Sequence, residues 1–426
     1  MGDRICSVSA REILGPHGFP TVEAQVITEK GHTGKGLVPW GMSVGKYESR
    51  KIYDGEARYR GFGVRQAVRN VNETIAPALI GMDVVCQNQV DAAMIELDGT
   101  EDKSNLGGNA ILPVSIAVAK AAASSLGLPL YRYLGGFSAR HLPVPMCNVV
   151  GGGKFYNPYL AFEDYLILAP GFDSFAEAIE AISMTYFTLG DILKETEGEI
   201  GTYNGIYTPR KMNNREVFEA ISKAIEKAGY EGRIFLALDV CADQFYDSKD
   251  DTYEVEGAHL TRGEFIEYLK GFRTKYPLVF IEDPLHEDDF EGLAELTERI
   301  TDTIICGDDV FASNIQRIRE GVRQKAANCL LLKIDQVGSV SEAYESAMCA
   351  LGSSYSVTVS MRSRDTTETV IADLAVGTGA QIIKFGAPIL AERIEKINRL
   401  CYIEHELGGS AEFQGKSVLG AFMPDC

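Results

Sequence analysis

The chain has 426 residues, of which 45% are hydrophobic and 24% are charged, a composition that excludes disordered, collagen-like and disulfide-rich classes. Lys and Arg number 41 against 60 Asp and Glu, a formal net charge of −19, so neither nucleic acid nor an anionic membrane surface is expected as a partner. The length allows two domains if one of them is a large barrel.

The start of the chain lacks the pattern of a targeting segment. Residues 1–5 have neither the basic nor the apolar region of a signal peptide, and no stretch approaches the roughly 18 apolar residues of a membrane span. We therefore expect a cytoplasmic protein. The nine cysteines are scattered without a C-x-x-C pair, which indicates reduced thiols rather than a disulfide framework or a structural zinc site.

The first part of the chain, residues 1–140, is predicted to form a small α+β domain. Residues 4–9 and 21–28 are typical of strands, the second because apolar and polar side chains alternate along it. Residues 64–75 carry valine and isoleucine on one helical face. The run at residues 109–126 is rich in alanine and apolar enough to predict a buried helix.

From about residue 230 onward, short apolar runs that end in polar residues alternate with segments of helical periodicity. The polar ends are spaced 22 to 43 residues apart, about one strand–helix unit. Six such units predict a parallel α/β barrel. Strands at 143–150 and 162–169, with a helical region at 173–195, would complete eight. The six runs are 234–239, 278–282, 303–309, 329–333, 355–362 and 380–384.

Functional side chains in such barrels stand at the carboxyl ends of the strands. Asp239, Glu282 and Asp308 end three successive strands, so we expect them to converge. Three carboxylates repel one another unless a cation lies between them, and an all-oxygen ligand set suits Mg²⁺. The pattern favours a metal site that faces a base and an anion pocket, and a structural ion-pair network is the alternative. The later strands end in Lys333, Arg362 with Ser363, and Lys384.

Seven motifs extend over essentially the whole chain. They lie at residues 38–48, 96–104, 281–284, 307–309, 330–333, 336–339 and 383–388. In this order they resemble the motifs of the enolase family. The resemblance implies an α/β fold with a small α+β cap domain at 1–140 and an enolase-type (β/α)8 barrel at 141–426. It also implies an Mg²⁺-dependent lyase of glycolysis, phosphopyruvate hydratase, which converts 2-phosphoglycerate to phosphoenolpyruvate.

The resemblance gives a role to most of the charged residues at the barrel mouth. Asp239, Glu282 and Asp308 would hold one Mg²⁺, and the loop of Ser43 would close over a second. Enolase-superfamily sites use a Lys or His base with one or two Mg²⁺ ions, and Lys333 would be that base, with a pKa lowered by neighbouring cations. The implied substrate contacts are Lys384 at the carboxylate, Arg362 and Ser363 at the phosphate, and Glu163 and Phe155 in the pocket.

The chain departs from the family on the side that donates a proton to the leaving hydroxyl. The family carries a Glu there, and residues 201–209 place Asn204 at its position, unless the loop is shifted by one residue. An amide forms hydrogen bonds but is not a proton-donating acid. Asp164, Tyr203 or Tyr207 could donate instead. The other replacements are Glu163-Asp164 for Gln-Glu, Phe155 and Met361 for two His, Arg364 for Gly and Phe385 for Thr.

Three functions agree with this pattern. The first is an enolase-type lyase acting on 2-phosphoglycerate. The second is changed chemistry on a small phospho- or phosphono-carboxylic acid, as in the carboxyphosphonoenolpyruvate synthases, because the cations are retained while polar donors are replaced. The third is a non-catalytic binding protein. The resemblance also implies a homodimer formed through the small domain, although residues 15–21 lack the Arg of the corresponding family segment.

Overall fold

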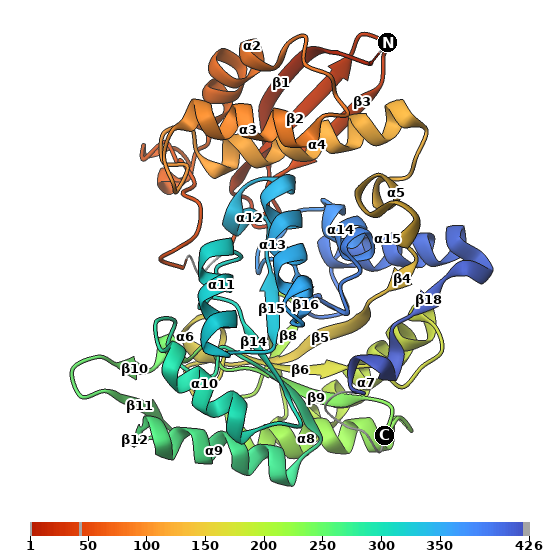
Figure 1. Ribbon diagram of the computed structural model, residues 1–426. Coiled ribbons are helices and arrows are strands. Elements are labelled where there is room, and N and C mark those ends of the chain that lie inside the picture. The colour runs from red at the N-terminus through yellow and green to blue at the C-terminus, as the bar shows by residue number, and fades with distance from the viewer. Residues whose placement is uncertain (1, 42–44, 421–426) are drawn as a thin grey trace.

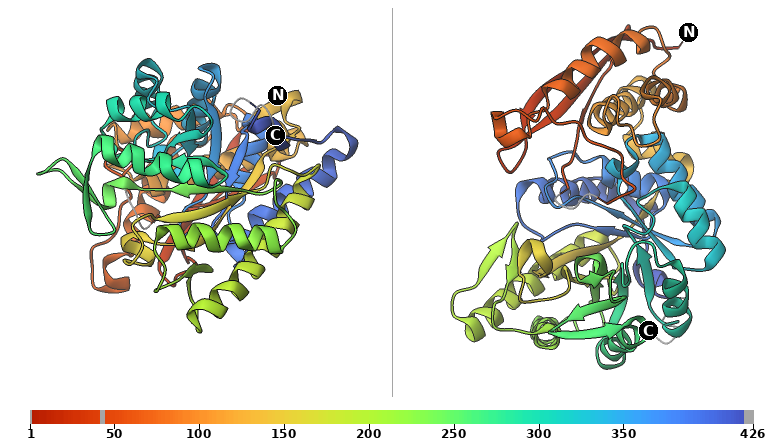
Figure 2. Two further views of the ribbon diagram at one scale, coloured as in Figure 1. Left: turned by 90° about the horizontal axis from the view of Figure 1, so that it is seen from below. Right: turned by 90° about the vertical axis from the view of Figure 1, so that its left-hand side faces the viewer.

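The computed structural model describes residues 2–41 and 45–420. An N-terminal part, made of the elements from β1 to α5, lies above a closed barrel in Figure 1. In the right-hand view of Figure 2, the segment after β3 runs from this part down to the barrel. There, Glu48 forms an ion pair with Arg362 and Lys51 forms one with Asp335, so the two parts are joined by buried charge pairs.

The N-terminal part contains a three-stranded antiparallel sheet with helices packed against it. The strands β1 (Ile5–Leu14), β2 (Pro20–Thr28) and β3 (Thr33–Leu37) lie in the order β1-β2-β3, which confirms both predicted strands. The helix α4 (Gly108–Leu126) confirms the one predicted at 109–126. The other helical elements are η1 (Arg58–Gly61), α1 (Arg65–Arg69), η2 (Asn70–Ile75), α2 (Ala76–Leu79), α3 (Gln87–Asp98), α5 (Leu130–Gly135) and η3 (Gly136–Ser138).

The helix α4 forms the centre of this part. Among the described residues it has the length and apolar composition of a membrane span, but 78% of that window is buried inside the protein, as in the core helix of a soluble fold. It lies so close to β3 that a Cβ atom at Gly34 would overlap the carbonyl oxygen of Ala117, and one at Gly36 would overlap that of Pro113. Glycine is required at both positions because the two backbones nearly touch.

Eight strands form the barrel, which closes where the last strand pairs with the first. The closure confirms the predicted α/β barrel, and the six strands that follow residue 230 match the six predicted runs. The strands are β5 (Val144–Gly151), β6 (Asp164–Leu168), β9 (Phe235–Asp239), β13 (Leu278–Glu282), β14 (Ile304–Gly307), β15 (Cys329–Leu332), β16 (Ser356–Ser360) and β17 (Ile382–Lys384).

One strand runs against the prediction of an all-parallel barrel. β6 is antiparallel to both of its neighbours, β5 and β9, whereas the other adjacent barrel strands pair in parallel. The reason is the short connection from β5 to β6, which contains only the four-residue helix α6 (Gly153–Tyr156). A parallel return usually runs through a full helix, which this connection lacks.

The later barrel strands alternate with helices that cover the outside of the barrel (Figure 2, left). Side chains cap the start of two of these helices: Thr261 forms a capping box with Glu264, and Ser339 accepts a hydrogen bond from the backbone of Glu342. The helices are α7 (Phe175–Glu197), α8 (Asn214–Lys227), α9 (Arg262–Lys275), α10 (Phe290–Arg299), α11 (Ile315–Gln324), α12 (Ile334–Val337), α13 (Val340–Gly352), α14 (Val370–Thr378) and α15 (Ala391–Leu407).

Short strands and 3-10 turns complete the fold. β7 (Gly201–Tyr203) and β8 (Ile206–Thr208) form a hairpin that joins the barrel sheet beside β5. β10 (Tyr246–Asp247), β11 (Thr252–Val255) and β12 (Ala258–Thr261) form a separate antiparallel sheet. The remaining elements are β4 (His141–Leu142), which pairs with β18 (Glu412–Phe413), and the turns η4 (Ala242–Gln244), η5 (Gly408–Ser410) and η6 (Gly415–Val418).

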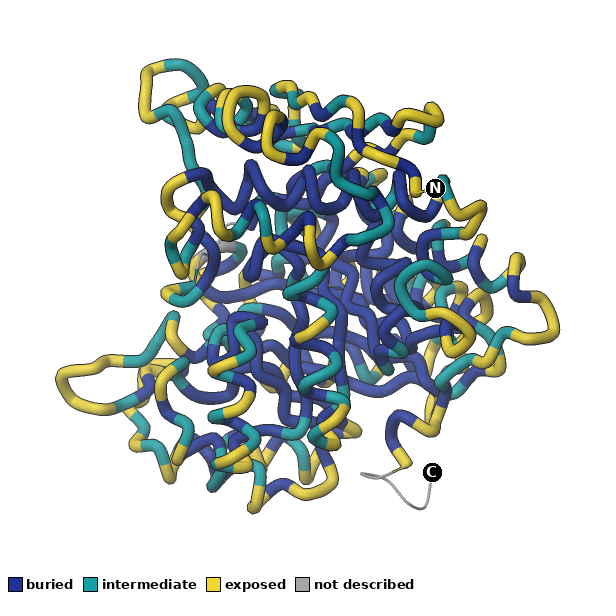
Figure 3. Tube along the Cα trace, turned by 45° about the horizontal axis from the view of Figure 1, so that its top comes forward, coloured by how far each residue is buried: buried dark blue, intermediate teal, exposed yellow. Residues whose placement is uncertain are grey.

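The inside of the barrel is filled with apolar side chains away from its mouth. Met146, Leu166, Phe280, Leu331 and Ile382 belong to this cluster and are fully buried. Figure 3 shows buried residues concentrated in the centre of the molecule and exposed residues in the peripheral loops. The described cysteines are all free thiols, as the sequence predicts. A packed interior leaves the rim of the strands as the place for polar chemistry.

The contact between β3 and α4 gives a stability prediction. Gly34→Ala inserts a methyl group where the backbone of α4 already lies, so we expect a loss of about 1–3 kcal/mol in the free energy of unfolding, measured by urea denaturation. Gly271→Ala is the control, because Gly271 is exposed in α9 with nothing near its Cβ direction. That change should stabilise by about 0.5–1 kcal/mol. Equal effects of the two substitutions would contradict the close approach.

Candidate active site

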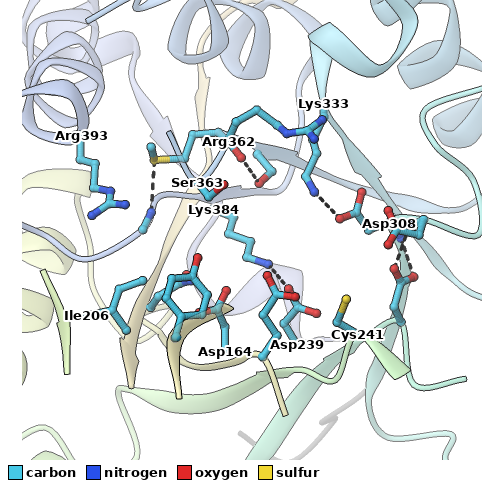
Figure 4. A pocket seen from close by; sticks show the side chains of 18 residues that line it. Asp164, Ile206, Asp239, Cys241, Asp308, Lys333, Arg362, Ser363, Lys384 and Arg393 are labelled. Atoms are coloured by element: carbon cyan, nitrogen blue, oxygen red, sulfur yellow. Dashed lines mark hydrogen bonds and ion pairs between the residues drawn. The ribbon is translucent and has the colours of Figure 1, made fainter. Parts of the chain in front are cut away.

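The rim formed by the carboxyl ends of the parallel strands holds the predicted charged residues, and Figure 4 shows how they surround one cavity. Asp239, Glu282 and Lys384 are the last residues of β9, β13 and β17. Asp308 and Lys333 directly follow β14 and β15. All of these except Glu282 line the cavity, together with Arg362 and Ser363. The prediction that these strand ends converge is confirmed.

Glu163 and Asp164 reach the same cavity from the opposite end of a strand. Asp164 is the first residue of β6, and because β6 is antiparallel, it lies in register with Asp239 at the end of β9 and Gly151 at the end of β5. Both acids line the cavity. A rule based on strand carboxyl ends misses them, so only the family resemblance placed them in the site.

Lys384 lies between two of the predicted metal ligands. Its Nζ donates to Asp239 Oδ2 at 2.7 Å and to Glu282 Oε2 at 2.6 Å. The second carboxylate oxygen of Glu282, Oε1, is buried without a hydrogen-bond partner. Burial and the nearby charge of Asp239 raise the pKa of Glu282 well above its ordinary value. An unpartnered buried acceptor among carboxylates fits a cation, which would also reverse that pKa shift.

Lys333 is held by Asp308. Lys333 Nζ contacts Asp308 Oδ2, and Gln336 Nε2 donates to Asp308 Oδ1 at 2.8 Å. Burial, with a smaller effect of Arg362, lowers the pKa of Lys333, but the negative charges of Asp308, Asp309 and Glu282 together outweigh both, so the pKa is raised. The side chains alone therefore do not give the lowering expected from neighbouring cations, because an acid pairs with Lys333 directly.

A second group of carboxylates was not predicted. Asp283, Asp308 and Asp309 bring ligand oxygens within 4.8 Å of one another, and only Asp308 belongs to the predicted set. Asp283 accepts hydrogen bonds from the backbone N–H groups of Asp308 (2.8 Å) and Asp309 (2.7 Å), so it holds the loop after β14. The signal was present, since Asp283 and Asp309 directly follow Glu282 and Asp308 in the sequence.

The predicted phosphate-binding Arg362 is tied to the N-terminal part. Its guanidinium donates to both carboxylate oxygens of Glu48, at 3.0 and 3.1 Å, and lies 3.2 Å from Asp335 Oδ2. Asp335 is also paired with Lys51 at 2.6 Å. These four side chains form a buried network across the junction of the two parts. No local sequence pattern indicates it, because the pairs that cross the junction are 314 and 284 residues apart.

Asn204 occupies a tight turn. It is the first of two residues between β7 and β8, with φ +52°, and Gly205 follows with φ +78°, the geometry of a type I′ hairpin turn, which favours Asn-Gly. Its side-chain amide donates to the carbonyl oxygen of Ser363 at 3.1 Å. In this hairpin it is Ile206, and not Asn204, that lines the cavity. The Asn-Gly pair was the available signal for the turn.

The proposed substitute donors differ in placement. Tyr203 accepts a hydrogen bond from Arg364 at 3.3 Å, and the ring of Tyr207 stacks on that of Tyr186 with centroids 4.7 Å apart. Neither tyrosine is among the described residues that line the cavity, whereas Asp164 and the unpredicted Tyr156 are. Asp164 is therefore the one of the three predicted donors that faces the cavity.

The remaining replaced positions are partly described. Met361 lines the cavity, and its sulfur accepts a hydrogen bond from the Gly386 N–H at 3.3 Å. Phe385 is fully buried and packs edge-on against Phe175, outside the cavity lining. Phe155 lies in α6, but its side chain is outside the described part of the structure, as is the whole of Ser43.

Comparison with known proteins identifies the family. Residues 5–134 match the family described as "Enolase, N-terminal domain", and residues 139–421 match "Enolase, C-terminal TIM barrel domain". This chain belongs to the enolase family. Proteins named enolase from Methanopyrus kandleri, Methanothrix thermoacetophila and Thermococcus gammatolerans are 50%, 48% and 47% identical to it. The matches cover 96%, 98% and 98% of this chain and 97%, 99% and 99% of those proteins.

Two acids in this member of the enolase family have pKa values raised to near neutral pH. Burial, followed by repulsion from Asp239 and Asp164, raises the pKa of Glu163 to about 8. Burial also raises the pKa of Asp164 to about 7, with Lys384 opposing and Asp239 adding to the effect. Gln244 Nε2 donates to Glu163. Near pH 7 these carboxyl groups can therefore donate a proton as well as accept one.

The raised pKa of Glu163 predicts how stability varies with pH. Between its ordinary value of 4.5 and about 8, the folded protein keeps a proton that the unfolded chain has lost, so this group's contribution to stability falls as pH rises through that window. Glu163→Gln removes the group but keeps an acceptor for Gln244. We expect the variant to be more stable than wild type at pH 8 and to show a shallower fall, measured by urea denaturation in EDTA.

The control for this experiment is Glu226→Gln, at an exposed position on α8. An exposed carboxylate meets water in both states, so the control should keep the slope of stability against pH seen in wild type. A Glu163→Gln variant with the wild-type slope would show that Glu163 is ionised in the folded protein throughout this range.

Proposed function

We propose that this chain is an Mg²⁺-dependent carbon–oxygen lyase that removes the α-proton of 2-phosphoglycerate and eliminates the β-hydroxyl to give phosphoenolpyruvate. The observation that carries the proposal is the meeting of Lys333 with Asp239, Glu282 and Asp308 at one barrel rim in a chain of the enolase family. We also place the enzyme in the cytoplasm, as a member of glycolysis. The homodimer stays a prediction.

The carboxylates of Asp239, Glu282 and Asp308 are proposed to hold Mg²⁺, and the Ser43 loop to supply a second site. The fit rests on hard oxygen donors and on the buried, unpartnered Oε1 of Glu282. Bound Mg²⁺ would neutralise the negative charge that develops when a proton is removed next to a carboxylate. Lys384, which bridges two of these acids, would then be able to turn one of its N–H groups to the substrate carboxylate.

Lys333 is proposed as the base. Asp308 keeps it charged in the ligand-free site, and a charged ammonium cannot accept a proton. Once Asp308 serves as a metal ligand, its charge is shared, and the burial of Lys333 lowers the lysine pKa instead. Lys333 therefore becomes basic only when the site is filled. Arg362 and Ser363 are proposed to bind the phosphate, and Glu163 and Phe155 to line the pocket.

Asp164 is proposed as the acid that replaces the family Glu. It faces the cavity, it begins β6 beside Asp239, and its pKa of about 7 leaves part of it protonated at neutral pH. Asn204 cannot fill this role because its amide is no acid and its side chain is turned to Ser363. A general acid typically contributes about 10²–10⁴ in rate, so the donor matters for the turnover number.

The proposal predicts that enol absorbance forms from 2-phosphoglycerate only when Mg²⁺ is present. Lys333→Ala removes the base and should lower kcat about 10²- to 10⁴-fold. Lys270→Ala changes an exposed residue of α9 and should keep wild-type activity. Circular dichroism would check that both variants fold. Absence of turnover by wild type at high enzyme concentration and saturating Mg²⁺ would refute the proposed reaction.

A further inference from the structure

Four basic side chains line the cavity in the described part of the chain, and one of them is not paired with an acid. Lys333 contacts Asp308, Lys384 contacts Asp239 and Glu282, and Arg362 contacts Glu48 and Asp335. Among the described residues, no carboxylate oxygen lies close enough to Arg393 to form an ion pair with it. Arg393 is thus the one of these four cations that no described carboxylate contacts directly, although its charge lowers the pKa of Asp164 in the same cavity.

Arg393 is deeply buried and incompletely hydrogen-bonded. It is 1% exposed and lies in the first turn of α15. One terminal N–H donates to the backbone carbonyl of Asn204, and its Nε is buried without a partner. A guanidinium is always charged in proteins, and burying such a charge without an anion is costly. The arrangement is therefore complete only when an anion enters the cavity.

The backbone keeps space for this side chain. A Cβ atom at Gly386 would lie 2.5 Å from Arg393 Nε, so a larger residue in the loop after β17 would displace the guanidinium from this position. The turn at Asn204 presents its carbonyl to the same group. Two loops thus fix the guanidinium at the cavity wall. In Figure 4 this wall, shared with Ile206, lies across the cavity from Lys333 and Asp308.

We propose that Arg393 is a catalytic residue of the elimination step, in which it binds the departing hydroxyl group and stabilises the negative charge that develops on its oxygen while Asp164 protonates it; this rests on the proposed function. Lys333 takes the C2 proton, and the electron pair of that bond passes into the carboxylate. The C3–O bond then breaks, its pair leaves with the oxygen, and the pair from C2 forms the C2=C3 bond. Asp164 gives its proton to that oxygen, which leaves as water. Lys333 then loses the C2 proton to solvent, and Asp164 regains one.

The location favours this role over phosphate binding. Arg393 touches Asn204, the residue at the position where the family resemblance puts a proton donor, and it faces the base from the opposite wall. A fixed positive charge with two N–H donors cannot protonate the leaving group, but it lowers the energy of the negative charge that develops there. Such a charge acts only in the step that breaks the C3–O bond, not in removal of the C2 proton.

The test separates these two steps. Exchange of the C2 proton of 2-phosphoglycerate in D₂O, followed by NMR, reports on Lys333, and phosphoenolpyruvate formation reports on elimination. Arg393→Met keeps a buried side chain of similar length without the charge. We expect it to lower elimination by about 10²–10³ while exchange changes by less than about tenfold. Arg393→Lys, which restores a charge, should recover part of the elimination rate.

The matched control is Arg399→Met. Arg399 lies in the same helix but pairs with Asp373 outside the cavity, so the ratio of exchange to elimination should stay at the wild-type value even if the melting temperature falls. An Arg393→Met protein that loses exchange and elimination equally would show that Arg393 only supports the fold, and would overturn the proposal. Wild-type protein that neither exchanges nor eliminates would overturn the proposed function as well.

Discussion

The structure depends on how one barrel rim accommodates many buried acids. Seven carboxyl groups come together there, and their electrostatic repulsion would open the barrel mouth if all were ionised without counter-charges. Contact with a cation lowers the pKa of Asp308, where Lys333 acts against burial, but it does not do so for Glu282, whose pKa stays raised beside Lys384. Where the contact is missing, the acid keeps its proton, as at Asp309, whose pKa burial and Asp308 raise to about 8. The carboxyl groups of the rim therefore bind protons where no cation compensates their charge. A divalent cation would replace those protons, so the rim favours its binding.

The N-terminal part takes a direct share in this charge balance. Glu48 and Lys51 reach the barrel rim and pair with Arg362 and Asp335. All four side chains are largely removed from water. Loss of either member of a pair would therefore leave a buried charge without a counter-charge, which destabilises the fold. The junction between the two parts is thus fixed by the charges that also define one wall of the cavity, and a shift of the N-terminal part would change the orientation of Arg362.

The sequence predicts features that are encoded locally and misses those that depend on long-range pairing. The barrel strands and the residues at their ends, such as Asp239 and Glu282, follow from runs of a few residues whose spacing repeats. The direction of β6 cannot be predicted in this way, because an apolar run has the same pattern whichever way the strand runs. It depends on the β5–β6 connection, which lacks a full helix. Likewise the contact of Lys333 with Asp308, 25 residues away, reverses the expected pKa shift, because no local pattern tells which neighbour will be closest.

Asn204 shows how one residue can alter chemistry and backbone together. Its turn needs two successive residues with positive φ, and Asn followed by Gly is the pair that adopts this most readily. A glutamate at the same place would be strained, because an unbranched acid without Asn's short local hydrogen bonds is uncommon in the left-handed region. The turn also directs the Asn204 carbonyl at Arg393. The loss of an acid and the placement of a buried guanidinium are thus consequences of one hairpin. This divergence from the family therefore points to a change in how the charge of the leaving group is stabilised.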